Sequence, residues 1–141
     1  MYVENWMTRR VHVVKPLDTI DHARELMVRH RVNQLPVLVD GRLVGIVTDR
    51  DLRDAFPSVF ESPQHHPQGR ATTAAPEAIK VESVMTGNVL TSRPNDSLVH
   101  AARLMRKERI GALPVVDGAH VVGIITRSDV LAAFVALGET F

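Results

Sequence analysis

Two short stretches of the sequence place a threonine and an aspartate where they could bind a phosphorylated nucleoside. Gly45–Asp51 reads GIVTDRD and Gly123–Asp129 reads GIITRSD, so each is an apolar run followed by Thr-x-x-Asp. A strand that ends at the threonine would place the next residues at the start of a helix. The free N–H groups and partial positive charge there can bind phosphate, and a nearby carboxylate can accept both hydroxyls of a ribose.

The same pattern also has a purely structural interpretation. Thr-x-x-Asp resembles a capping box, in which the threonine hydroxyl accepts from the third helical N–H and the acid reaches back to the threonine N–H. Aspartate is shorter than the glutamate or glutamine usually found there, so the fit is poorer. Thr48 and Thr126 could therefore be helix caps, ligand contacts or both, because the two roles do not exclude each other.

The two stretches occupy equivalent positions of an internal repeat. Val3–Arg53 aligns with Val81–Leu131 without a gap, and the shared segments include Met-Thr, Leu-Pro-Val and Val-Gly-Ile besides the threonine and the aspartate. This agreement indicates a tandem duplication.

Each copy predicts the element order β-α-β-β-α and therefore a mixed α/β (α+β) fold. Val11–Val14 is a β-branched run that ends before Pro16, which predicts a strand and a turn. Thr19 in the first copy and Ser97 in the second are placed to cap the following amphipathic helix.

A hairpin and a final helix complete each copy. Asp40-Gly41 lies between two apolar runs, which predicts a tight turn with positive φ angles. Asp117-Gly118 comes one residue earlier in its copy, so we expect a different turn geometry there. We expect the final helices to run from about Asp49 to Phe56 and from about Arg127 to Leu137.

The repeats predict a division into residues 1–56, a linker over 57–80, and residues 81–141. The linker is rich in proline and polar residues, as loops are. It contains the pair His65-His66, but two adjacent histidines without further ligands do not predict a metal site.

Composition excludes several classes of protein. Lys and Arg number 17 against 16 Asp and Glu, and aromatic residues make up 4%, which disfavours a nucleic-acid binder. The absence of cysteine excludes disulfides, zinc–thiolate sites and thiol nucleophiles. No apolar run is long enough to span a membrane, so we expect a soluble, cytoplasmic protein. No GxGxxG, Walker, HExxH or GxSxG motif is present, and we predict no enzymatic activity.

The ordered set of Met-Thr, helix, Leu-Pro-Val, hairpin and Gly-h-h-Thr-x-x-Asp (h, hydrophobic), present twice, resembles a pair of CBS domains, also called a Bateman module. Thr48–Glu61 and Asp129–Glu139 carry a narrower similarity to acetoin-utilisation B-type CBS proteins. Members of that group often continue into an ACT domain, and this chain ends at Phe141, which puts an acetoin-related role in doubt.

The resemblance implies two clefts between the copies, related by a pseudo-two-fold axis, that bind AMP, ADP, ATP or S-adenosylmethionine. In each cleft the aspartate would hold the ribose, the residues at the helix start would face phosphates, and the other copy would enclose the adenine. The resemblance assigns Thr48, Arg50, Asp51, Thr86, Thr91, Gly111 and Ala112 to one cleft. It assigns Thr126, Ser128, Asp129, Thr8, Val13, Asn33 and Gln34 to the other, in which Arg127 is also a predicted contact because of its charge.

The two clefts should differ in charge. Asp49 puts a negative charge where a phosphate would lie, and Arg127 puts a positive charge at the equivalent position. We therefore expect the Asp129 cleft to bind phosphorylated ligands more tightly, by about 1 kcal/mol for each charge.

The last helix is apolar on more than one face. Val130–Leu137 reads VLAAFVAL, which predicts burial on two sides, either within the chain or against a second copy in a homodimer.

Together these features predict a ligand-sensing regulatory module that acts on an unknown partner protein. The alternative is a scaffold whose Thr-x-x-Asp motifs are only helix caps. The sequence does not decide which adenosine ligand is preferred. It also leaves open a cyclic dinucleotide as the ligand and a module in which one cleft is empty.

Overall fold

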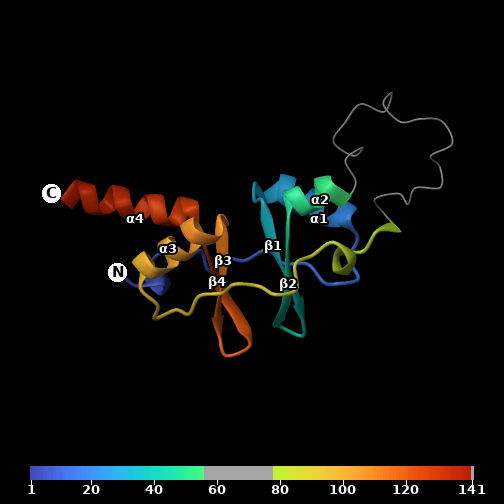
Figure 1. The fold of residues 1–141 in the computed structure, drawn as a ribbon, viewed down its shortest axis with the longest axis horizontal. Helices are drawn as coiled ribbons and strands as arrows, with labels where there is room; N and C mark the ends of the chain where they lie inside the picture. The colour runs from blue at the N-terminus through green and yellow to red at the C-terminus, as the bar shows by residue number, and fades with distance from the viewer. Residues whose placement is uncertain (56–77, 141) are drawn as a thin grey trace, which may run out of the picture. The chain divides into compact units, whose positions relative to one another are not determined.

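The computed structural model describes residues 1–55 and 78–140, which belong to two compact units (Figure 1). Unit 1 comprises Met1–Val11, Gly41–Leu43 and Leu90–Phe141, and unit 2 comprises His12–Asp40 and Val44–Val89. Each unit combines most of one repeat with the N-terminal segment of the other, an exchange that the repeat alone does not predict. The division into 1–56, 57–80 and 81–141 follows the repeats and stays a prediction.

Unit 1 packs two helices against a hairpin. Its elements are η1 (Val3–Asn5), α3 (Leu98–Glu108), β3 (Ala112–Asp117), β4 (His120–Thr126) and α4 (Arg127–Thr140). Strands β3 and β4 are antiparallel, in a register that pairs Leu113 with Ile125. The buried apolar side chains form one core: Val3, Met7, Leu98, Ala101, Met105, Leu113, Val115, Ile125 and Ala133.

Unit 2 repeats this arrangement, as the duplication predicts. Its elements are α1 (Ile20–His30), β1 (Gln34–Val39), β2 (Arg42–Thr48, of which the first two residues count with unit 1), α2 (Asp49–Ala55) and η6 (Val81–Ser83). Strand β1 is hydrogen-bonded to β2. The core of this unit consists of Val14, Ile20, Ala23, Met27, Leu35, Val37, Val47, Leu52 and Val81.

The exchanged N-terminal segments are held by paired backbone hydrogen bonds. The Thr8 N–H donates to the Ile124 carbonyl at 2.8 Å, and the Ile124 N–H donates back at 2.9 Å. Thr86 and Ile46 form the same pair of backbone hydrogen bonds in unit 2, each of 2.9 Å. Val3 and Val81, which precede these threonines, are fully buried. Each N-terminal segment is thus part of the core of the unit that it joins.

The helix caps form as the sequence predicts. The Thr19 hydroxyl accepts from the His22 N–H, and the Ser97 hydroxyl accepts from the N–H groups of Val99 and His100. Satisfying these free helical donors stabilises a helix by about 1 kcal/mol.

The two hairpin turns differ, which confirms the prediction made from the position of Asp-Gly. Asp40 and Gly41 both have positive φ, of 51° and 80°, as in a type I′ turn. In the second hairpin Gly118 alone has positive φ, of 65°, and stands first in the loop, as in a type II′ turn.

Two predicted boundaries were wrong. Val11–Val14 is not a strand, because only Val14 forms a bridge, to Val37 of β1, and the residues before it make no ladder. Helix α4 continues past Leu137 to Thr140, because no proline follows and Gly138 does not stop a helix by itself. Phe56 and the linker histidines lie outside the described residues. No described helix is both long enough and apolar enough to cross a membrane.

Candidate functional site

The start of α4 carries the most extensive polar network in the predicted site. Thr126 ends β4, and its N–H donates to Asp129 Oδ2 at 2.9 Å. The Asp129 N–H donates to Thr126 Oγ1 at 3.2 Å, and this hydroxyl donates to Asp129 Oδ2 at 2.9 Å. The predicted capping box is therefore present, and it holds the carboxylate beside the helix N-terminus.

The exchanged N-terminal segment adds a further contact to this network. Thr8 Oγ1 donates to Asp129, 3.1 Å from Oδ1 and 3.3 Å from Oδ2. The backbone bonds between Thr8 and Ile124 place the hydroxyl there. Both Asp129 oxygens thus accept hydrogen bonds from side chains that a ligand hydroxyl could replace.

The start of α2 has the same cap but a less occupied carboxylate. The Thr48 N–H donates to Asp51 Oδ2 at 2.8 Å, and the Asp51 N–H donates to Thr48 Oγ1 at 3.1 Å. Within residues 1–55 and 78–140, neither Thr86, the equivalent of Thr8, nor any other group donates to Asp51 Oδ1. Asp51 Oδ1 therefore accepts no hydrogen bond from the described residues, whereas Asp129 Oδ1 accepts one from Thr8 and keeps a further lone pair for a ligand.

The segment that precedes each Leu-Pro-Val strand contacts the helix start of its own unit. The Asp49 N–H donates to the Asn33 carbonyl at 2.9 Å, and the Arg127 N–H donates to the Gly111 carbonyl at 3.1 Å. A Cβ added to Gly111 would lie 3.6 Å from Arg127 Cζ, so the guanidinium lies against this glycine.

The other predicted residues divide between the two units. Unit 1 contains Thr91, Ala112 and Ser128, in addition to the residues already described there: Thr8, Gly111, Thr126, Arg127 and Asp129. Unit 2 contains Val13, Gln34 and Arg50, in addition to Asn33, Thr48, Asp51 and Thr86. Ala112 is buried, whereas Arg50 and Ser128 are exposed at their helix starts. Each predicted cleft draws residues from both units, and both composite sets stay predictions.

The charge difference between the two helix starts has a structural consequence. Asp49 forms an ion pair with Arg53 at 3.0 Å, one turn along α2. Arg127 takes part in no ion pair within the described part of the chain. The α2 start therefore carries an ion-paired acid, and the α4 start carries a cation that has no ion pair among the described residues.

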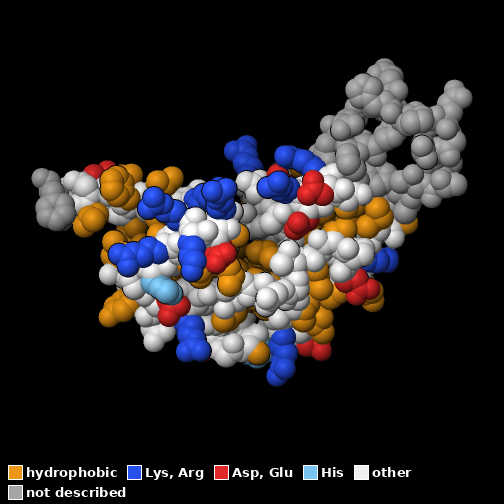
Figure 2. Space-filling view, viewed as in Figure 1, with side chains coloured by type: hydrophobic (Ala, Val, Ile, Leu, Met, Phe, Trp, Pro, Cys, Tyr) orange, Lys and Arg blue, Asp and Glu red, His pale blue; other side chains and the backbone are white. Residues whose placement is uncertain are grey.

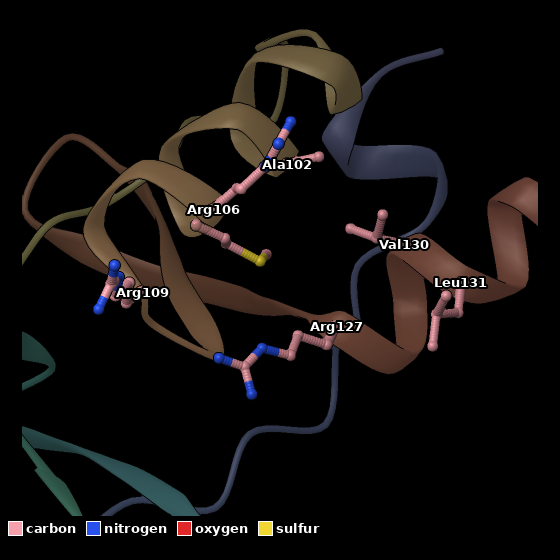
Figure 3. Close-up of a pocket in the computed structure, with 7 residues that line it drawn as sticks. Ala102, Arg106, Arg109, Arg127, Val130 and Leu131 are labelled. Carbon is pink, nitrogen blue, oxygen red and sulfur yellow. The ribbon is translucent and has the colours of Figure 1, made fainter.

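Sequence reasoning missed a pocket next to this cation. In unit 1, α3, α4 and the residue after α3 line an open pocket of about 590 Å³ (Figure 3). Its lining residues are Ala102, Met105, Arg106, Arg109, Arg127, Val130 and Leu131. The only signal for it in the sequence was the clustering of arginines towards the end of α3, which is also typical of a solvated helix end.

Metal ligands do not gather in the described residues. No group of three or more His, Asp or Glu side chains there could hold a metal ion. The polar chemistry of the helix starts consists of threonine hydroxyls, carboxylates, arginines and backbone N–H groups, which suits a hydroxylated, anionic ligand.

The two threonine–aspartate caps are expected to have a measurable effect on stability. Thr126→Ala should lower the free energy of unfolding by about 1–2 kcal/mol and Thr48→Ala by about 1 kcal/mol, because the Thr126 hydroxyl also donates to its aspartate. Urea unfolding measures both values, with Thr126→Ser and Thr48→Ser as controls that keep the cap. Losses below a few tenths of a kcal/mol in both alanine variants would contradict the capping interpretation.

The chain matches a family model along both repeats. The model of the CBS domain matches residues 3–58 and 81–136. The chain is 35% identical over 127 residues to the CBS domain-containing protein YhcV of Bacillus subtilis, covering 90% of this chain and 81% of that protein. It is also 35% identical over 133 residues to the protein MJ1225 of Methanocaldococcus jannaschii, covering 94% of this chain but only 46% of that protein.

Solved structures share both fold and sequence with the chain. CBSX2 of Arabidopsis thaliana in complex with AMP has a TM-score of 0.80 and 34% identity, covering 97% of this chain and 98% of that one. The AcuB protein of Vibrio cholerae has a TM-score of 0.80 and 30% identity, and the match covers 99% of this chain and 93% of that one. The CBS domain pair of MJ0100 in complex with 5′-methylthioadenosine and S-adenosyl-L-methionine has a TM-score of 0.78 and 27% identity. This match covers 96% of this chain and 97% of that one.

Proposed function

This chain belongs to the CBS domain family, and we propose that it is a regulatory, non-catalytic module that senses an adenosine-containing ligand. The observation that carries the proposal is the pair of aspartates, Asp51 and Asp129, each held by a threonine at a helix N-terminus. The ligands of the similar structures, AMP, S-adenosyl-L-methionine and 5′-methylthioadenosine, support it because all three contain adenosine.

The roles proposed for the two helix starts follow from their chemistry. Each aspartate accepts the ribose hydroxyls, since a carboxylate has lone pairs beyond those that the cap uses. Thr48 and Arg50 at one start, and Thr126, Arg127 and Ser128 at the other, face the phosphates. The rest of the two sets enclose the adenine: Thr86, Thr91, Gly111 and Ala112 with Asp51, and Thr8, Val13, Asn33 and Gln34 with Asp129.

Ligand-induced stabilisation tests this proposal. Saturating AMP, ADP, ATP or S-adenosylmethionine should raise the melting temperature of the whole chain, because a ligand that binds only the folded state stabilises it. Inosine monophosphate at the same concentration is the control for adenine recognition. No shift with any adenosine compound would instead favour a scaffold whose Thr-x-x-Asp motifs serve only as the caps described above.

We propose that the active form is a homodimer built on α4. Four apolar side chains of this helix are exposed, Leu131 at 63%, Phe134 at 70%, Val135 at 54% and Leu137 at 45%. Their exposure in the described part of the chain favours a second copy as the cover over packing into the core of their own chain. A continuous apolar face of this kind is typical of a protein–protein contact, and a second copy would cover it.

A charge in the middle of this face should separate the dimer. Phe134→Asp is expected to convert a dimer into a 15.6 kDa monomer at micromolar concentration, because an aspartate would be buried without a partner. Light scattering measures the mass, and Val39→Asp, at an exposed valine of β1, is the matched control. A wild-type chain that is already monomeric, or a Phe134→Asp dimer, would contradict the dimer proposal.

The proposal also includes the location and the context of the module. We place it in the cytoplasm, acting on a partner protein whose state changes with the bound ligand. Its effect on that partner cannot exceed the difference in ligand affinity between the two states. The likeness to AcuB supports a link to acetoin metabolism as the first context in which to search for this partner.

A further inference from the structure

The carboxylate of Asp129 has fewer lone pairs left for a ligand than the carboxylate of Asp51. An ionised carboxylate has about four acceptor positions, two on each oxygen. Asp129 Oδ2 accepts from the N–H and the hydroxyl of Thr126, both at 2.9 Å, and Oδ1 accepts from the Thr8 hydroxyl at 3.1 Å. Three of the positions are thus in use and one, on Oδ1, stays open for a ligand.

Asp51, at the equivalent place in unit 2, accepts fewer hydrogen bonds. Its Oδ2 accepts from the Thr48 N–H at 2.8 Å, and the Thr48 hydroxyl accepts from the Asp51 N–H at 3.1 Å. In the described ranges 1–55 and 78–140, neither the hydroxyls of Thr48 and Thr86 nor any other side chain donates to this carboxylate. Three of about four acceptor positions are therefore open at Asp51, against one at Asp129.

The Thr8 hydroxyl can leave Asp129 without a movement of its backbone. Thr8 and Asp129 both belong to unit 1, and backbone hydrogen bonds of 2.8 and 2.9 Å join Thr8 to Ile124. Thr8 is exposed, so a rotation about its χ1 can turn the hydroxyl towards solvent. A ligand hydroxyl can then take the vacated position on the carboxylate. This exchanges one hydrogen bond for another, so its net gain in free energy is small.

We propose that the Thr8 hydroxyl competes with one ribose hydroxyl for Asp129, and that Thr8 thereby sets the ribose specificity of this site. The inference rests on the proposed function, and it refines the place of Thr8 among the residues around the adenosine. At Asp51 both ribose hydroxyls find open positions, so the loss of either one removes a charge-assisted hydrogen bond. At Asp129 the second hydroxyl gains only what Thr8 gives up. The Asp129 site therefore accepts adenosine ligands with a single free ribose hydroxyl, which the Asp51 site discriminates against.

Titration with ADP and with 2′-deoxy-ADP measures this difference at each site. The two ligands carry the same phosphates, so Arg127 and the Lys and Arg side chains gathered over α3 (Figure 2) act on both alike, and the ratio of affinities isolates the hydroxyl. In an Asp51→Ala chain, which retains the Asp129 site, ADP should bind no more than about threefold more tightly than 2′-deoxy-ADP. In an Asp129→Ala chain, which retains the Asp51 site, this ratio should be about tenfold or more.

Substitutions of Thr8 assign the difference to its hydroxyl. Thr8→Val removes the hydroxyl and keeps the shape of the side chain, so in the Asp51→Ala chain it should raise the ratio to about tenfold by tightening ADP binding. A merely structural role of Thr8 would instead weaken both ligands alike and leave the ratio unchanged. Thr8→Ser, which keeps a hydroxyl, should retain the low ratio. Thr86→Val in the Asp129→Ala chain is the matched control, and it should leave the ratio of the Asp51 site unchanged.

The outcomes separate this inference from the proposed function. Equal ratios at the two sites, or a ratio at the Asp129 site that does not respond to Thr8→Val, would overturn the role of Thr8 while the binding of ADP still supported an adenosine sensor. Absence of ADP binding by the unmodified chain would overturn both. Urea unfolding shows whether each variant is folded at the titration temperature, and Thr8→Ala, which also lacks the hydroxyl, replaces Thr8→Val if the valine variant is not.

Discussion

Replacing Asp129 with alanine is expected to weaken ADP binding by about 30-fold or more, and to do so more than Asp51→Ala. A carboxylate that accepts two ribose hydroxyls makes charge-assisted hydrogen bonds worth about 2 kcal/mol, which corresponds to that factor. The difference between the sites comes from the helix starts, because Arg127 favours phosphate and the pair of Asp49 with Arg53 does not. Calorimetric titration of each variant with ADP measures both losses.

Two controls separate ligand contact from stability in this experiment. Both aspartates are part of caps, so each alanine variant should also lose stability, by about 1 kcal/mol. Urea unfolding of each variant shows that it is folded at the titration temperature, and adenosine without phosphate should show a smaller difference between the two sites. Equal losses of ADP affinity in the two variants would contradict the proposed charge asymmetry.

Replacing Gly123 with alanine is expected to destabilise unit 1 by about 1–3 kcal/mol. A Cβ at this position would lie 2.7 Å from Met7 Sδ and 3.0 Å from the Thr8 carbonyl oxygen, both in the exchanged N-terminal segment. The sulfur can move, but the backbone of Thr8 is held by its hydrogen bonds to Ile124. Alanine should therefore push the N-terminal segment away and remove the bond from Thr8 to Asp129.

Gly138→Ala is the matched control for this substitution. Gly138 lies inside α4 with nothing within 4 Å of an added Cβ, so alanine should stabilise the helix by about 0.5–1 kcal/mol. Urea unfolding of both variants gives the two values, with opposite signs. If Gly123→Ala were as stable as the wild type, the tight docking of the N-terminal segment against β4 would be wrong.

The local chemistry of this protein could be predicted from its sequence, because it depends on residues close together in the chain. The capping boxes, the helix caps at Thr19 and Ser97, and the two turn types all follow from residues within a few positions of each other. The hydroxyl of Thr126 and the carboxylate of Asp129 meet because three residues of helix bring them together. Such contacts need no knowledge of the rest of the fold.

The contacts that could not be predicted are those between distant parts of the chain. Nothing in the repeat shows that Met1–Val11 joins the core of the second copy, since an N-terminal segment packed on its own copy would have the same sequence. The bond from Thr8 to Asp129 depends on this exchange. The strand expected over Val11–Val14 failed for a related reason, because β-branched residues favour extended backbone but a strand needs a partner along its whole length.

The arginine pocket shows a further limit of sequence reasoning. Arg106 is on α3, Arg109 directly follows this helix and Arg127 is the first residue of α4, so their approach depends on how two helices pack. From sequence alone, arginines near a helix C-terminus are explained by the helix dipole. Comparison of the repeats becomes informative only when the structure shows that Asp49 is paired with Arg53, whereas Arg127 forms no ion pair with any residue of 1–55 or 78–140.

Isothermal titration of the unmodified protein with AMP, alongside the double variant Asp51→Ala/Asp129→Ala, tests the central claim most directly. The account predicts saturable binding at micromolar concentration by the wild type, and no measurable heat with the double variant once urea unfolding has shown that it is folded. Inosine monophosphate should give at most a weak signal. Absence of heat with AMP, ADP, ATP and S-adenosylmethionine alike, or undiminished binding by the double variant, would contradict an adenosine sensor that uses these two aspartates.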